Sequence, residues 1–188
     1  MASRPGPASR HVALLRGINV GGRNPIRMAH LKACFEECGF HGVATYIQSG
    51  NVVFETGDGS GVTQLTTEVE EMLQGAFGLE IPVVVVAREK MREIVDCAPP
   101  GFGLEPDRYR YDVVFLKPPL TAADAISEVP VQEDVDNAHA GPGALYFSRV
   151  IAQASRSRLS RLVSLPIYQS TTIRNWNTTT RLLELLER

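Results

Sequence analysis

Two short stretches in the first half of the chain carry polar residues that could bind a ligand. The first follows an apolar run, and the second joins two β-rich runs. The residues concerned are Arg16, Asn19, Gly21, Gly22, Asn24, Gln48, Ser49 and Asn51. Glycines let backbone N–H groups point outward, and a helix start favours negative charge. These residue types suit the binding of a phosphate or a carboxylate.

The same residues also have a structural interpretation. Asn and Gly at strand ends commonly complete turns, and Gln48 could brace a hairpin. The sequence supports the two interpretations about equally, so both are carried forward.

A second candidate lies near the C-terminus, where the string Arg174-Asn175-Trp176-Asn177 combines a guanidinium, two amides and an aromatic ring. Such a ring could stack on a base or another planar group. The structural alternative is a helix start capped by Asn and anchored by a buried Trp. That alternative is favoured, although it leaves Arg174 unexplained.

Several common chemistries lack their sequence signatures. Neither G-x-G-x-x-G nor G-x-x-x-x-G-K-[ST] occurs, and no Ser lies in G-x-S-x-G. Cys34 and Cys38 are one helical turn apart, but no second ligand pair completes a metal site, so we predict none. The sequence identifies no cofactor, substrate or reaction, and it leaves open whether the protein is an enzyme. A Ser–His–Asp site assembled in space also stays open.

Nucleic-acid binding is the competing interpretation. The formal net charge is −2, yet residues 141–188 contain seven Arg and two Glu, which makes that segment about +5. Aromatic residues are poorly placed for an RNA recognition motif, because the first strand has none. The second half has Tyr111, Phe115, Tyr146 and Phe147 near the basic residues Arg149, Arg156, Arg158 and Arg161. A protein-interaction module with an exposed sheet is a third interpretation.

The polar loops of the first half need a scaffold that brings them together. Periodicity and turn residues predict strands at 11–20, 43–47, 51–55 and 81–87, and helices at 28–38 and 62–77. This β-α-β-β-α-β order is that of a ferredoxin-like domain with one antiparallel sheet. The first strand would then lie beside the hairpin, so that Asn19 and Asn24 neighbour Gln48 and Asn51.

The second half repeats this order less clearly. We expect strands at 111–116, 134–140, 144–150 and 170–173, with helices at 121–127 and 155–163. The predicted organisation is a disordered leader (1–10), a ferredoxin-like domain (11–87), a linking helix and loop (88–110), a second ferredoxin-like domain (111–174) and a C-terminal helix (175–188). The predicted fold class is α+β, with tandem ferredoxin-like (βαββαβ) domains.

The composition is globular, with 44% hydrophobic and 21% charged residues among 188. No apolar run approaches the roughly 18 to 20 residues of a membrane span, and the first ten residues lack a secretory signal. Three cysteines at irregular spacing suit a reducing compartment. We therefore expect a cytoplasmic protein that acts away from membranes, and the oligomeric state is left open.

The strings LRGINVGG at 15–22, YIQSGNV at 46–52 and RNWNT at 174–178 together span nearly the whole chain. They resemble a bacterial family called domain of unknown function 1697. The resemblance implies tandem ferredoxin-like domains, in agreement with the order of elements. It implies no reaction, cofactor or catalytic residue.

Overall fold

A computed structural model describes residues 9–22, 24–57 and 59–188. Within it the chain forms two compact units. The first comprises the described residues up to Glu89 together with Leu182–Arg188, and the second comprises Lys90–Arg181. Most of the predicted leader lies outside the described residues. Ser9 and Arg10, its last two residues, belong to the first strand, so regular structure begins earlier than predicted.

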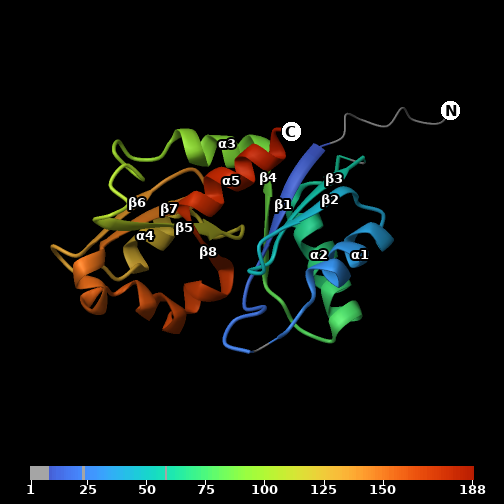
Figure 1. Cartoon of the computed structure of the whole chain (residues 1–188), viewed down its shortest axis with the longest axis horizontal. Helices are drawn as coiled ribbons and strands as arrows, with labels where there is room; N and C mark the ends of the chain where they lie inside the picture. Colours follow the sequence, from blue (N-terminus) through green and yellow to red (C-terminus); the bar gives the residue numbers. More distant parts are fainter. Residues whose placement is uncertain (1–8, 23, 58) are drawn as a thin grey trace. The chain divides into compact units, whose positions relative to one another are not determined.

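The first unit contains one four-stranded antiparallel sheet of order β2-β3-β1-β4. Helices α1 and α2 cover the same face of this sheet (Figure 1). The elements in chain order are β1 (Ser9–Leu15), α1 (Met28–Glu37), β2 (His41–Tyr46), β3 (Asn51–Thr56), α2 (Val62–Phe77) and β4 (Val83–Ala87). Helix α3 (Arg88–Asp96) follows directly.

The core of the first unit follows from the two periodicities in the sequence. Alternate residues of β1, including Ala13 and Leu15, are fully buried on the face that the helices cover. Leu65, Val69 and Leu73 recur every fourth residue on α2 and are fully buried in the same cluster. Burial of these side chains fixes which way each strand faces.

The first strand is shorter than the sequence predicts. β1 ends at Leu15, because Gly17 and Asn19 adopt positive φ angles of 77° and 53° that a strand cannot contain. Residues 16–22 and 24–27 therefore form a loop, and Arg16 lies just past the strand instead of within it.

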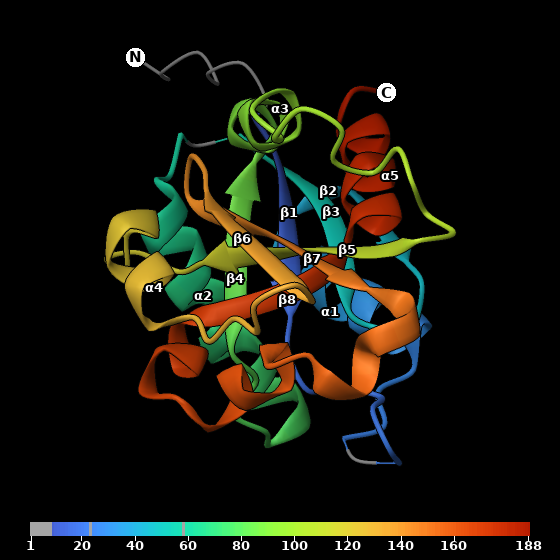
Figure 2. The same ribbon diagram turned by 90° about the vertical axis from the view of Figure 1, so that its left-hand side faces the viewer.

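The second unit also contains a four-stranded antiparallel sheet, of order β6-β7-β5-β8 (Figure 2). Three 3₁₀ segments lie between its last two strands. The elements are β5 (Tyr109–Leu116), α4 (Ala122–Glu128), β6 (Asp136–Ala140), β7 (Ala144–Val150), η1 (Ile151–Arg156), η2 (Leu159–Ser164), η3 (Pro166–Ser170), β8 (Thr171–Asn175) and α5 (Trp176–Leu186).

The prediction of an α-helix at 155–163 is wrong, because this segment forms the 3₁₀ segments η1 and η2. Ser155, Ser157 and Ser160 compete for backbone hydrogen bonds and so disfavour an α-helix. The turns still bury Leu159 and Leu162 against the sheet, in one cluster with residues of α4. The segment thus supplies apolar cover without a regular helix.

The other face of the second sheet carries an aromatic cluster. Phe102, in the loop before β5, makes edge contacts with Tyr111, Tyr146 and Trp176 at centroid distances of 4.8, 5.5 and 5.1 Å. The Tyr146 hydroxyl donates to the carbonyl of Ile94 at 2.6 Å. Burial raises the pKa of Tyr146 to about 12, so this hydroxyl stays protonated.

The C-terminal helix begins where the sequence places it. Asn175 is its cap, because the Asn175 Oδ1 accepts from the backbone N–H of Asn177 at 3.0 Å. Leu182 and Leu186, from the part of α5 that belongs to the first unit, are fully buried. None of the described helices is both long and apolar enough to cross a membrane.

Substitution of Gly50 tests how closely the β2–β3 hairpin packs against the end of β1. A Cβ at this position would lie 2.8 Å from the Leu15 Cβ and 2.8 Å from the Ile18 Cδ1, and φ is +78°. Gly17 has nearly the same φ, +77°, but open space around it. We expect Gly50→Ala to lower the free energy of unfolding by about 1 kcal/mol or more beyond the loss from Gly17→Ala, measured by urea denaturation. Equal losses would show that backbone conformation alone matters there.

Candidate functional site

The polar loops of the first unit meet as predicted. Leu14 pairs with Asn51 in the sheet, and the Leu15 N–H donates to the carbonyl of Gly50 at 2.8 Å. The end of β1 and the β2–β3 hairpin are therefore neighbours, and the segment after β1 runs beside the hairpin. This arrangement depends only on the order of the strands.

Asn19 joins the two loops. Its Nδ2 donates to the carbonyls of Ile26 and Gln48, both at 3.0 Å, while its Oδ1 accepts from the Ile26 N–H at 2.8 Å. Every polar atom of this amide thus bonds to the backbone. Asn19 is a structural brace, which is the structural interpretation considered from sequence.

The other asparagines serve the same purpose. The Nδ2 of buried Asn51 donates to the carbonyl of Tyr46 at 3.0 Å and to the Ser49 hydroxyl at 3.1 Å. Asn24 donates to the carbonyl of Gly17 at 3.1 Å. Gln48 is exposed, as are Gly21 and Gly22, while Arg16 is half-buried and its N–H donates to the carbonyl of Pro82.

A hollow of about 430 Å³ opens beside this brace. Its lining residues are Asn19, Pro25, Ile26, Arg27, Met28 and Gln48. Helix α1 starts here without a side-chain cap, and its first turn contains no acidic residue. Sequence reasoning found Asn19 and Gln48 but missed Arg27, which is exposed at the start of the helix. The available signal was a basic residue directly before the first apolar position of the helix.

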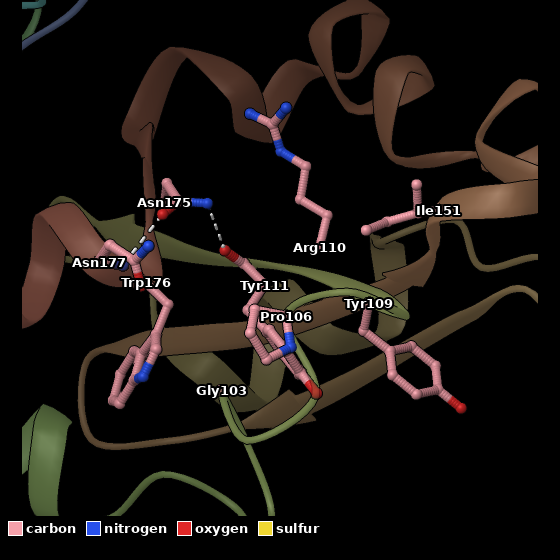
Figure 3. Close-up of a pocket in the computed structure, with 9 residues that line it drawn as sticks. All are labelled: Gly103, Pro106, Tyr109, Arg110, Tyr111, Ile151, Asn175, Trp176 and Asn177. Carbon is pink, nitrogen blue, oxygen red and sulfur yellow. Dashed lines mark hydrogen bonds between the residues drawn. The ribbon is translucent and has the colours of Figure 1, made fainter.

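The C-terminal string borders a second pocket, also of about 430 Å³, which lies within the second unit (Figure 3). The predicted residues Asn175, Trp176 and Asn177 line it. The sequence did not predict the other lining residues, which are Gly103, Pro106, Tyr109, Arg110, Tyr111 and Ile151. These residues come from the loop before β5, the start of β5 and the start of η1, so no sequence motif joins them.

Arg174 does not line this pocket. It lies on β8 opposite Val113, where it is 8% exposed. Its Nη1 donates to the carbonyl of Ile173 at 2.9 Å, and burial lowers the pKa of Arg174 to about 10. The guanidinium remains charged at neutral pH and is part of the packed sheet.

Arg110 is the one charged residue among those that line the second pocket. Its Nε lies 3.4 Å from the Oδ2 of Asp112, whose side chain is almost fully buried. Burial raises the pKa of Asp112, against the opposing effect of Arg110 and Arg149. The partly exposed Arg110 side chain thus contacts Asp112 through its Nε, on the face of β5 opposite to Tyr109 and Tyr111 (Figure 3).

The cysteines show no metal-binding arrangement. Cys34 is buried, Cys38 is exposed, and burial raises the pKa of both thiols. Among the described residues, no group of three or more His, Cys, Asp or Glu side chains lies close enough to hold a metal ion.

The two pockets lie in a mixed α/β protein that has two four-stranded antiparallel sheets and a C-terminal helix. The chain belongs to the DUF1697 family, described as a protein of unknown function, whose model matches residues 8–146. The resemblance read from sequence is thus confirmed, although the string at 174–178 lies beyond the matched residues.

One solved structure with a similar fold is that of the conserved bacterial protein SP0830 from Streptococcus pneumoniae. It superposes with a TM-score of 0.82 at 24% sequence identity, covering 95% of this chain and 99% of the other. At this identity the likeness concerns the fold alone. No protein with a curated description matches the chain.

Substitution of Asn51 tests whether the polar side chains at this edge stabilise the β2–β3 hairpin. Asn51→Ala removes the side-chain donor to the carbonyl of Tyr46 and to the Ser49 hydroxyl, so we expect the free energy of unfolding to fall by about 1 to 3 kcal/mol. Urea denaturation measures this loss. Asn177→Ala is a matched control, because its exposed side-chain amide makes no hydrogen bond to any described residue. Similar stability of the two variants would contradict the bracing role of Asn51.

Proposed function

We propose that this protein binds an anionic small molecule, a phosphate or a carboxylate, in the hollow at the edge of the first unit. The observation that carries the proposal is the uncapped start of α1. The first helical bond runs from the Leu31 N–H to the Arg27 carbonyl, so the N–H groups of Met28, Ala29 and His30 have no helical acceptor. An anion is the partner that such a helix start favours.

The charge around the hollow supports the same ligand class. Arg27 is exposed beside these N–H groups, and no acidic residue lines the hollow. The amide of Gln48 adds a neutral donor from the hairpin, whereas Asn19 and Asn51 act as scaffold. The proposal thus keeps the predicted location and transfers the binding role to Arg27 and the helix start.

The lining of the hollow favours binding over catalysis. Arg27 is its one titratable side chain, and a guanidinium remains protonated at neutral pH. The hollow therefore has neither a nucleophile nor a general base among its lining residues. We propose a binding protein that senses or carries the anion.

Arg27→Ala tests the proposal. We expect titration calorimetry with inorganic phosphate and with succinate to show saturable binding of at least one probe to the unaltered protein. Loss of a charged hydrogen bond of about 1.5 kcal/mol or more should weaken that binding roughly tenfold or more.

Lys32→Ala is the matched control. It removes one positive charge from the same helix, where Lys32 lies 3.7 Å from Glu36 and does not line the hollow. It should leave probe affinity within about twofold, because exposed charges at this distance are screened. Absence of binding by both probes, or equal weakening by the two substitutions, would remove the proposed site.

A second candidate function, nucleic-acid binding, is favoured by one observation. Arg156, Arg158 and Arg161 lie in or beside consecutive 3₁₀ segments, and none forms an ion pair with any described residue. Recognition through stacking on the sheet is not supported, because Tyr111 and Tyr146 are buried and contact Phe102. Any such binding would be to the phosphate backbone.

Replacement of all three arginines by Gln tests this candidate. Anisotropy titrations with a labelled single-stranded RNA should show weak binding that declines with salt. The slope of log affinity against log salt should become shallower by about 0.7 for each phosphate that the variant no longer binds. If the unaltered protein shows no complex at low salt, this function is excluded.

Two further assignments accompany the proposal. We assign both units to the ferredoxin-like architecture, supported by the sheet orders and, in the first unit, by the β-α-β-β-α-β order. We place the protein in the cytoplasm, a location that suits its three free cysteines. A protein-interaction role would appear as self-association in light scattering.

A further inference from the structure

We infer that a third pocket, the sheet pocket of the second unit, binds a neutral sugar ring. The sheet pocket has a volume of about 230 Å³. Sites for drug-sized ligands span about 300 to 1,000 Å³, so this pocket suits a single ring. Its polar and aromatic lining residues include Glu105, Tyr109, Tyr111, Asn137, His139 and Ser148. The inference is independent of the function proposed for the first unit.

The floor of the sheet pocket is a row of side chains across three neighbouring strands, β5, β7 and β6 (Figure 2). Tyr111 of β5 pairs with Ser148 of β7, and Ser148 pairs with Asn137 of β6. Tyr109 and His139 lie two residues further along β5 and β6, so both face the same side of the sheet as this row. Strand register therefore brings the polar groups together.

The loop before β5 forms the wall of the sheet pocket and is held in place before a ligand arrives. Phe102 of this loop contacts the rings of Tyr111 and Tyr146 at centroid distances of 4.8 and 5.5 Å. The Glu105 N–H donates to the Tyr111 hydroxyl at 3.4 Å, and the Phe102 N–H donates to the Pro99 carbonyl at 2.9 Å. Preorganisation of this kind lowers the entropy cost of binding.

Three side chains of the sheet pocket have hydrogen-bonding capacity to spare. The side chains of Asn137, His139 and Ser148 form no hydrogen bond to any described residue. An amide, a neutral imidazole and a hydroxyl each supply both a donor and an acceptor. Each hydroxyl of a sugar is likewise a donor and an acceptor, so neighbouring hydroxyls of one ring can bond to several of these groups at once.

The charge around the sheet pocket favours a neutral ligand. Glu105 is the one acidic residue among the described residues that line it, and the Arg108 Nη1 lies 3.7 Å from the Glu105 Oε1. None of these lining residues is Lys or Arg. Arg110 pairs with Arg149 one position along from the floor residues, so both face the opposite side of the sheet. The Glu105 carboxylate can still accept from sugar hydroxyls.

Tyr109 supplies the apolar surface on which a sugar ring packs. It is half-buried, and the guanidinium carbon of Arg108 lies 5.0 Å from the centroid of its ring, which helps to hold the ring in place. The C–H groups of a sugar ring are attracted to the electron-rich face of an aromatic ring. Tyr111 is buried against Phe102, so the floor lacks the several open rings on which single-stranded RNA stacks.

The same residues favour binding over catalysis. His139 and Ser148 line one pocket, but no hydrogen bond joins their side chains, so they do not form a nucleophile and base pair. Most glycosidases use two carboxylates, whereas Glu105 is the only carboxylate among the described residues of the pocket. The sheet pocket therefore holds a sugar without cleaving it.

Ligand-observed NMR titration tests the inference. The probes are the methyl glycosides of glucose, galactose, mannose and N-acetylglucosamine, with adenosine as a planar ring of a different class. We expect at least one glycoside to bind saturably with a Kd of about 10 mM or lower, and inorganic phosphate at about 10 mM should not displace it. Arg27→Ala, which alters the hollow of the first unit, should leave this binding unchanged.

Substitutions identify the residues responsible. Asn137→Ala removes hydrogen bonds to the sugar and should weaken glycoside binding roughly three- to tenfold. Tyr109→Leu removes the aromatic face and should weaken it roughly threefold or more. Asn177→Ala is the matched control, because Asn177 is an exposed asparagine of the same unit that does not line the sheet pocket. It should change the affinity by less than about twofold. Thermal denaturation verifies that each variant is folded.

Three results would overturn the inference. The first is a folded, unaltered protein that binds none of the glycosides up to about 50 mM. The second is binding of adenosine but of no glycoside, which would indicate a site for a nucleobase. The third is glycoside binding that Asn137→Ala and Asn177→Ala weaken equally, which would place the sugar elsewhere. Failure of phosphate to bind at the first unit would affect none of these results.

Discussion

The polar edge of the first unit depends on a single amide, that of Asn19. Few of the described residues between β1 and α1 belong to regular secondary structure, so side-chain hydrogen bonds help to fix the position of this segment. Asn19 makes three of them, to the backbone of Ile26 on one side and of Gln48 on the other. Both of these residues line the hollow. The shape of the candidate anion site therefore depends on one side chain whose oxygen and nitrogen both bond to the backbone.

In the second unit, aromatic contacts hold the loop before β5 in position. Phe102 lies in a loop, yet its ring contacts residues of β5, β7 and α5. Edge contacts of this kind are worth roughly 0.5 to 1.5 kcal/mol each beyond the apolar area they bury. They hold the loop against the sheet, and the loop in turn forms one wall of the second pocket.

Sequence reasoning succeeded where periodicity and strand order decide the outcome. It placed α1, α2, the β2–β3 hairpin and the start of α5, because burial and capping are local signals. It failed at Arg16, where positive φ angles end the strand, and at 155–163, where 3₁₀ turns replace a helix. It also missed Arg27 and Tyr109, since a pocket is formed by residues that folding brings together. The asparagines predicted as ligand-binding residues in the first unit donate to backbone carbonyls, and polar side chains next to glycines can serve either role.

The division of the chain into units makes the first of them discontinuous in sequence. Leu182 and Leu186 belong to it and are fully buried, although more than ninety residues of the second unit precede them. During synthesis, the segment up to Glu89 emerges from the ribosome long before these two leucines are made. The first unit is therefore completed only when the last residues of the chain have been made. A fragment cut at residue 89 would lack these two buried leucines.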